Sequence, residues 1–171
     1  MQKELKLTGS GGQGLILAGV ILAEAAILDG KKAIQSQSYG PEARGGSSKA
    51  EVIISNDEID FIKVQNCDML LCLTQDAYDK YGKDFTKAMI IDESLELKYQ
   101  EPEKVFKFPI LSTAAEKLGK PMVANIIALG AVNGILDLVS KESILEAVLN
   151  RVPKGTEELN KQALEAGYGL V

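Results

Sequence analysis

Histidine does not occur anywhere in this sequence of 171 residues. Its absence excludes a histidine general base, a Ser-His-Asp triad and a metal site with histidine ligands. Tryptophan is absent too, and aromatic residues make up only 5% of the chain, which disfavours a stacking platform for single-stranded nucleic acid. The net charge of −5 reflects no excess of lysine and arginine, so we expect no nucleic-acid partner.

Cysteine is scarce as well, since Cys67 and Cys72 are the only two. Their spacing suits neither a CxxC redox pair nor a set of iron–sulfur ligands. Because Cys72 lies within an apolar run, we predict two reduced thiols in and beside a core strand. The sequence indicates no catalytic residue and no metal ligand.

Long apolar runs are also missing, and the longest is interrupted by Glu24 and Asp29, so no segment is long enough to cross a bilayer. The first residues lack the basic start and apolar block of a signal peptide. We therefore expect a cytoplasmic protein without a membrane partner. The length suits a single domain covering residues 1–171.

Strand patterns and helix patterns alternate along the chain, which predicts an α/β three-layer sandwich with a largely parallel central sheet. Apolar or alternating runs predict strands at 5–8, 32–36, 49–55, 68–74, 88–92 and 105–109. Helical spacing predicts helices at 15–28, 75–83, 112–118, 121–139, 140–150 and from Thr156 onward. The helices at 15–28 and 121–139 are apolar enough to be buried either in the core or against a partner.

A glycine-rich loop lies between the first strand and the first helix, and it reads Gly9-Ser10-Gly11-Gly12-Gln13-Gly14. Glycine allows the positive φ of a tight turn and lets a phosphate approach the backbone closely. The free N–H groups that begin the helix would then face the anion. The loop therefore predicts a site for a phosphate-bearing group or a contact with another protein. Close packing of helix on strand is the structural alternative.

Two common nucleotide sites fit this loop poorly. A nicotinamide or flavin site needs an acidic residue at the end of the second strand, where Gln35 and Ser36 stand. A P-loop needs Lys-Ser or Lys-Thr directly after the glycines, and neither follows. A nicotinamide-dependent dehydrogenase is accordingly disfavoured.

A second polar segment, residues 37–47, is rich in glycine, proline and serine and is predicted to be a loop. Within it, Arg44 offers a planar fork for a phosphate or carboxylate, and Tyr39 offers a flat face with a hydroxyl. Loops at the carboxyl ends of strands gather at one edge of a doubly wound sheet. We therefore expect this segment and the glycine loop to lie side by side.

These two segments together resemble the gamma subunit of 2-oxoacid:ferredoxin oxidoreductases, as do the helix at 123–131 and the tail at 151–160. The resemblance covers nearly the whole chain. It is strongest to the 2-oxoglutarate branch, with the pyruvate and ketoisovalerate enzymes as relatives. It implies a fold like the gamma domain of pyruvate:ferredoxin oxidoreductase.

The resemblance further implies an accessory subunit of an enzyme that oxidatively decarboxylates a 2-oxoacid, forms an acyl-CoA and passes electrons to ferredoxin. Thiamine diphosphate, magnesium and iron–sulfur clusters would lie on the alpha and beta subunits, with a ferredoxin-like delta subunit as a further candidate. The chain alone would be inactive and could form a homo-oligomer. A stand-alone nucleotide-binding or CoA-binding regulatory module is the alternative.

The resemblance implies that coenzyme A is the cofactor that binds to this chain itself. Its phosphates, or a neighbouring subunit, would meet the glycine loop, with the second segment lining the same cleft. The expected binding residues are Gly9, Gly11, Gly12, Gln13, Gly14, Tyr39 and Arg44.

Overall fold

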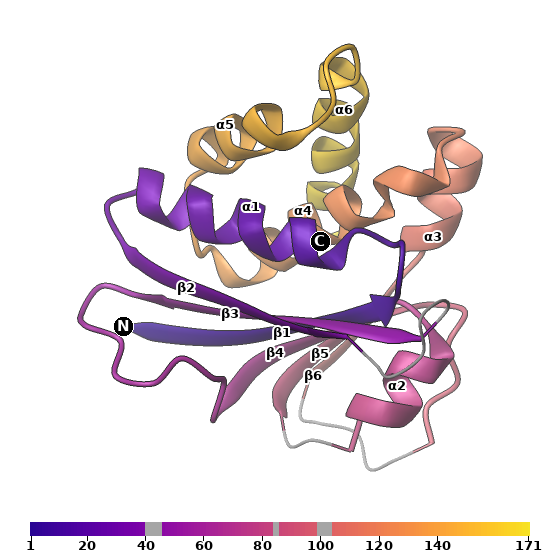
Figure 1. The fold of residues 1–171 in the computed structure, drawn as a ribbon. Coiled ribbons are helices and arrows are strands. Elements are labelled where there is room, and N and C mark those ends of the chain that lie inside the picture. The colour runs from indigo at the N-terminus through magenta and orange to yellow at the C-terminus, as the bar shows by residue number, and fades with distance from the viewer. Residues whose placement is uncertain (40–45, 84–85, 99–103) are drawn as a thin grey trace.

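Strand β1 (Gln2–Ser10) lies inside the central sheet of the computed structural model, which describes residues 1–39, 46–83, 86–98 and 104–171 (Figure 1). Within these ranges the sheet has six strands in the order β2-β3-β1-β4-β5-β6. The other strands are β2 (Lys32–Tyr39), β3 (Ser47–Ser55), β4 (Cys67–Cys72), β5 (Thr86–Asp92) and β6 (Lys104–Phe108).

The sheet is parallel on one side of β1 and antiparallel on the other. β4 pairs in parallel with β1, β5 with β4, and β6 with β5. β3 is antiparallel to both β1 and β2. The expected largely parallel α/β fold is confirmed, with an antiparallel edge that the strand patterns do not distinguish. Because β3 reverses direction between them, β1 and β2 point the same way without being neighbours.

Helices lie on both faces of the sheet and complete three layers (Figure 1). One face carries α1 (Leu15–Leu28) and, above it, α5 (Lys141–Arg151), while α2 (Gln75–Tyr81) covers part of the other face. The remaining helical elements lie on the same side as α1. They are α3 (Ile110–Ser112), the π-helix η1 (Thr113–Lys117), the 3-10 helix η2 (Pro121–Val123), α4 (Ala124–Leu136) and α6 (Glu157–Tyr168).

Successive residues of β4 enter two different hydrophobic cores. Met69 and Leu71 belong to the larger core under the α1 layer, whereas Leu70 and Cys72 join the smaller core under α2. Side chains alternate between the faces of a strand, so a strand covered on both faces must be apolar throughout. This explains the continuous apolar run in the sequence.

Helix α1 lies very close to the sheet at Gly19. A Cβ atom added there would lie 3.0 Å from the Cβ of Ala50 in β3. Burial on most sides, expected from its composition, holds along most of α1, but Ile27 is 60% exposed at its end. In α4, residues 124–133 are all buried within this chain.

Several predicted boundaries are wrong. The predicted loop 37–47 is too long, because β2 continues to Tyr39 and β3 begins at Ser47. The backbone of Gln37 pairs with Ala50 and that of Tyr39 with Ser48, and this pairing keeps the polar end of β2 in the sheet as its edge strand. The helix expected at 121–139 begins as η2 and stops at Leu136. The helix expected at 112–118 is a short α3 followed by the π-helix η1.

Candidate anion-binding site at the glycine loop

The glycine loop joins the carboxyl end of β1 to the start of α1, as predicted. Gly12 has φ 89° and Gly14 has φ 73°, both in the left-handed region that disfavours other residues. No heavy atom of the part of the chain that the structure describes lies within 4 Å of a Cβ placed on Gly12, so its backbone conformation explains the glycine. The loop is therefore open where Gly11 and Gly12 are exposed.

The Gln13 side chain folds back onto the loop and binds its backbone. Its Oε1 accepts a hydrogen bond of 2.8 Å from the backbone N–H of Ser10. A Cβ atom on Gly9 would lie 2.3 Å from that same oxygen. Gly9 thus makes room for the Gln13 side chain, which explains its identity without a ligand.

Gly14 is the N-cap residue directly before α1, and it has no side chain that could cap the helix. The first turn of α1 carries no acidic residue. The first N–H groups of a helix have no carbonyl partner within the helix. Among the described residues, no backbone carbonyl outside α1 accepts a hydrogen bond from the N–H groups of Leu15, Ile16 or Leu17. These donors, with the positive end of the helix dipole, make the loop a suitable receiver for a phosphate.

Asn125, at the start of α4, reaches this loop, and sequence reasoning assigned it no role. Its Nδ2 donates a hydrogen bond of 3.0 Å to the carbonyl oxygen of Gly14. A polar amide within the apolar run of α4 was the available signal.

The second predicted segment adjoins the glycine loop at its described ends. Gly11 donates its N–H to the carbonyl of Gly46 at 2.8 Å, and Ser10 pairs with Ser47. Tyr39 pairs with Ser48, so the end of β2 lies at the same edge. Arg44 lies outside the described residues, and its place at this edge stays a prediction.

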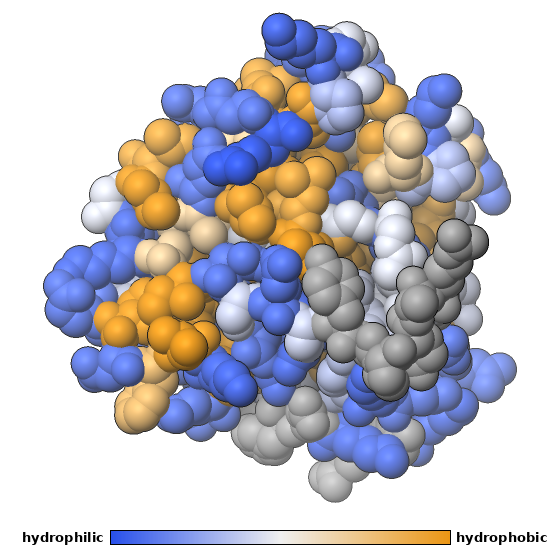
Figure 2. Space-filling model, viewed as in Figure 1, coloured by the Kyte–Doolittle hydropathy of each residue, from blue (hydrophilic) through white to orange (hydrophobic). Residues whose placement is uncertain are grey.

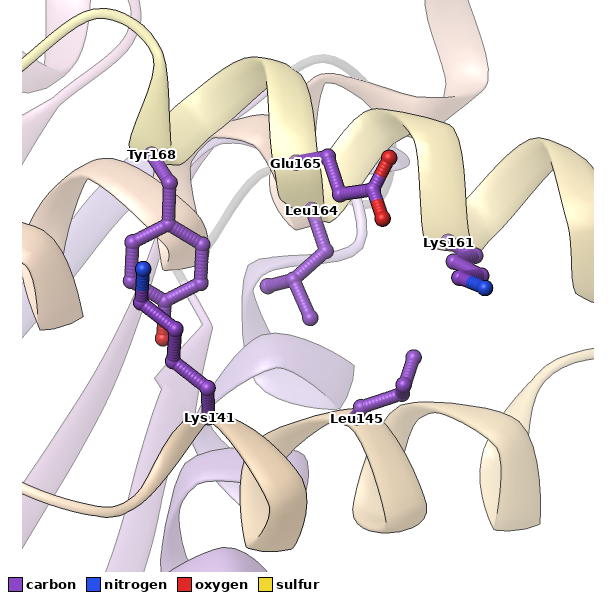
Figure 3. Close-up of a pocket in the computed structure, with 6 residues that line it drawn as sticks. All are labelled: Lys141, Leu145, Lys161, Leu164, Glu165 and Tyr168. Atoms are coloured by element: carbon purple, nitrogen blue, oxygen red, sulfur yellow. The ribbon is translucent and has the colours of Figure 1, made fainter.

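A cavity of about 360 Å³ lies elsewhere, between α5 and α6 (Figure 3). It is lined by Lys141, Leu145, Lys161, Leu164, Glu165 and Tyr168. The Lys141 ammonium lies 4.7 Å from the centre of the Tyr168 ring. Burial raises the pKa of the Tyr168 phenol, whose oxygen accepts a hydrogen bond of 2.6 Å from Asn133. Of the predicted ligand-binding residues that the structure describes, none is among those lining this cavity.

Hydrophobic side chains gather on the surface over α1 and the helices beside it, with hydrophilic ones around them (Figure 2). Ile27 and Leu28 contribute to this surface, at 60% and 43% exposure. They line a shallow groove of about 280 Å³ together with Val20, Ala23, Glu24, Gln35 and Arg151. Apolar surface of this kind is typical of a contact with another protein.

The described ranges bring no three His, Cys, Asp or Glu side chains together in a way that could hold a metal ion. Cys67 and Cys72 are buried and reduced, as predicted. No helix within the same ranges combines the length and the apolar character needed to span a bilayer.

Residues 4–170 match the family described as pyruvate ferredoxin/flavodoxin oxidoreductase, and the chain belongs to this family. It is 52% identical to the 2-oxoglutarate synthase subunit KorC of Methanocaldococcus jannaschii, over 98% of this chain and 93% of that protein. Relatives described as 2-oxoglutarate synthase subunits are 41–52% identical. Those described as pyruvate synthase or ketoisovalerate oxidoreductase subunits are 28–32% identical.

Solved structures agree with the fold. The gamma subunit of a keto/oxoacid ferredoxin oxidoreductase from Geobacter sulfurreducens is 49% identical, with a TM-score of 0.86 over 98% of this chain and 97% of that one. A 2-oxoglutarate:ferredoxin oxidoreductase from Magnetococcus marinus, solved with 2-oxoglutarate, coenzyme A and succinyl-CoA bound, is similar in fold. There the TM-score is 0.85 at 22% identity, over 99% of this chain and 31% of that one. The resemblance to gamma subunits is confirmed.

Proposed function

We propose that this chain is the gamma subunit of a multi-subunit 2-oxoglutarate:ferredoxin oxidoreductase. The complex would decarboxylate the 2-oxoacid, transfer the resulting acyl group to coenzyme A and pass two electrons to ferredoxin. The identity of 52% to a 2-oxoglutarate synthase subunit, over nearly the full length of both chains, carries this proposal. The lower identity to the pyruvate and ketoisovalerate relatives supports the choice of 2-oxoglutarate.

The role proposed for this chain is accessory. Thiamine diphosphate, magnesium and the iron–sulfur clusters are assigned to partner subunits, of the alpha, beta and delta types, and ferredoxin is reached through the complex. The exposed apolar end of α1, at Ile27 and Leu28, is a surface that such a partner could cover. We expect the complex in the cytoplasm.

Coenzyme A is the ligand proposed for the glycine loop. The open backbone of Gly11 and Gly12, the left-handed turn at Gly14 and the free N–H groups at the start of α1 suit its phosphates. The Gln13 side chain stabilises the loop by accepting a hydrogen bond from the Ser10 N–H, and the absence of a side chain at Gly9 leaves space for it. Tyr39 is proposed to line the same edge, and Arg44, on the sequence evidence alone, to add a cation.

Gly11 offers a clean test of this site. It is exposed, its φ is not positive, and among the described residues a Cβ on it would meet only the Gly46 oxygen, at 3.6 Å. In the assembled enzyme, Gly11→Glu should raise the KM for coenzyme A roughly tenfold or more, because a carboxylate would face the phosphates. Gly11→Gln, of equal size without the charge, should change it far less. Equal KM values for coenzyme A in both variants and the wild type would show that its phosphates do not bind at this loop.

The proposed assembly is tested separately. Native mass spectrometry of the protein purified from its source should show larger subunits bound to this chain. A lone chain of 18.4 kDa would instead favour the stand-alone CoA-binding module.

A further inference from the structure

Asn125 is a buried amide in the first turn of α4, only 5% exposed among apolar neighbours. Both of its polar atoms have partners. Nδ2 donates to the Gly14 carbonyl at 3.0 Å, and Oδ1 accepts from the N–H of Ile126 at 2.9 Å. A buried amide that lost these partners would be costly, so the side chain has one favoured orientation.

The carbonyl oxygen of Gly14, which Asn125 binds, has a second hydrogen-bond partner. The Gly14 carbonyl also accepts the N–H of Ala18 at 3.0 Å, which is the first hydrogen bond of α1. A Cβ atom on Gly14 would lie 2.5 Å from Asn125 Nδ2, so the two residues touch as closely as glycine permits. The peptide that follows Gly14 therefore has its direction fixed by α4 as well as by α1.

We propose that Asn125 is a positioning residue for the phosphate site of the glycine loop, an inference that rests on the proposed function. By holding the Gly14 carbonyl, it fixes the left-handed turn that aims the N–H groups of Leu15 to Leu17 out of the helix. Preorganised donors bind an anion more tightly than donors that must first be ordered. Loss of the Asn125 amide should weaken coenzyme A binding without changing the groups that touch the coenzyme.

Asn133 is a natural control on the same helix. It is 3% exposed and makes four hydrogen bonds where Asn125 makes two. Its Nδ2 donates to the Val139 carbonyl at 2.9 Å and to the Tyr168 phenol at 2.6 Å, and its Oδ1 accepts from the N–H groups of Leu138 at 3.0 Å and Val139 at 3.1 Å. Its partners lie at the other end of α4, away from the glycine loop. A variant at Asn133 therefore loses a buried amide with more hydrogen bonds than Asn125 but leaves Gly14 untouched.

The experiment compares Asn125→Ala, Asn125→Leu and Asn133→Ala in the assembled enzyme. We expect both Asn125 variants to raise the KM for coenzyme A roughly tenfold while kcat and the KM for 2-oxoglutarate stay within about twofold. Asn133→Ala should lower the melting temperature with an unchanged KM for coenzyme A. Asn125→Leu keeps the size of the side chain and adds no charge, so it serves if Asn125→Ala does not assemble. Hydrogen exchange in peptides covering residues 9–20 should accelerate only in the Asn125 variants.

The outcomes separate this inference from the proposal beneath it. If Gly11→Glu raises the KM for coenzyme A and the Asn125 variants do not, the positioning role is wrong while the site stands. If exchange in the loop accelerates but neither Gly11→Glu nor the Asn125 variants alter that KM, the loop is not the coenzyme A site and both fail. Equal effects of Asn125→Ala and Asn133→Ala on the KM would reduce Asn125 to a stabilising residue.

Discussion

Gly130 of α4 and Gly167 of α6 lie opposite one another where the two helices cross, and a Cβ atom added to either would lie within 3.0 Å of the other's Cα. A Cβ on Gly167 would also lie 2.0 Å from the carbonyl oxygen of Ile127. The backbones of the two helices are thus in direct contact. This contact joins the C-terminal helix to the helix that carries Asn125.

Gly167→Ala should therefore destabilise the chain by about 1–3 kcal/mol, since the added methyl group forces the helices apart. Urea unfolding of the purified chain measures the change. Gly169→Ala is the matched control, because a Cβ there would lie no closer than 3.4 Å to any other atom and its φ is −72°. If Gly167→Ala were as stable as Gly169→Ala, the close crossing would be wrong.

Asp29 links the end of α1 to the start of α5, and its contribution should depend on pH. Its carboxylate accepts from the N–H of Ser140 at 2.6 Å, from the Ser140 hydroxyl at 2.8 Å and from the Ser143 hydroxyl. Burial acts to raise the pKa of Asp29, but the hydrogen bonds from Ser143 and Ser140, helped by the charge of Lys31, outweigh it and hold the pKa below its usual 3.8.

Because this pKa is lowered on folding, the stabilisation is complete well above pH 4 and is lost as the pH falls through the folded value. The difference in unfolding free energy between wild type and Asp29→Asn should be largest near pH 7 and shrink toward pH 3. Unfolding curves across this range give the answer, with the exposed Asp60→Asn as control. A difference that grew on acidification would contradict the sign of the effect.

The two thiols should be inert in the folded chain. Burial raises the pKa of Cys67 and raises that of Cys72 to about 12. At pH 8 that leaves Cys72 with roughly a thousandfold less thiolate than a free cysteine, and the thiolate is the reactive form. Ellman's reagent should therefore modify both residues only after denaturation. Rapid reaction of either thiol in the native protein would show that the strand end is open.

Arg44 lies outside the described residues, and its role can be measured through ligand binding. Arg44→Ala should weaken the binding of coenzyme A to the assembled complex by about tenfold, as expected for loss of one charge-assisted hydrogen bond. Isothermal titration gives the affinity. Arg151→Ala is the control, because it removes the other arginine of the sequence, which pairs with Glu24 at 2.5 Å. Unchanged affinity and turnover for Arg44→Ala would take Arg44 out of the site.

The strands buried on both faces and the glycine loop could be predicted because their signals are local. The apolar run around Leu70 and the glycines before Leu15 are each contained in one segment. The antiparallel placement of β3 could not be predicted, because strand direction depends on partners elsewhere in the chain. The polar end of β2 also looked like a loop, since its pairing with β3 is what makes it a strand.

In the candidate site, too, residues with local sequence signals could be predicted and those with distant partners could not. Gly12 and Gly14 are predicted as parts of a glycine-rich loop between strand and helix, and their positive φ explains why glycine stands there. Asn125 was missed because its partner, Gly14, is 111 residues away, and no local pattern reports a contact at that separation. The crossing of Gly130 and Gly167 is hidden in the sequence for the same reason.

The most direct test of the account is the activity of the complex isolated through a tag on this chain. Reduction of a viologen dye should require both a 2-oxoacid and coenzyme A, and 2-oxoglutarate should be the best of a panel that includes pyruvate and ketoisovalerate. The chain purified alone should give no reduction. Reduction by the isolated chain, or a complex whose rate is the same when coenzyme A is omitted, would contradict the account.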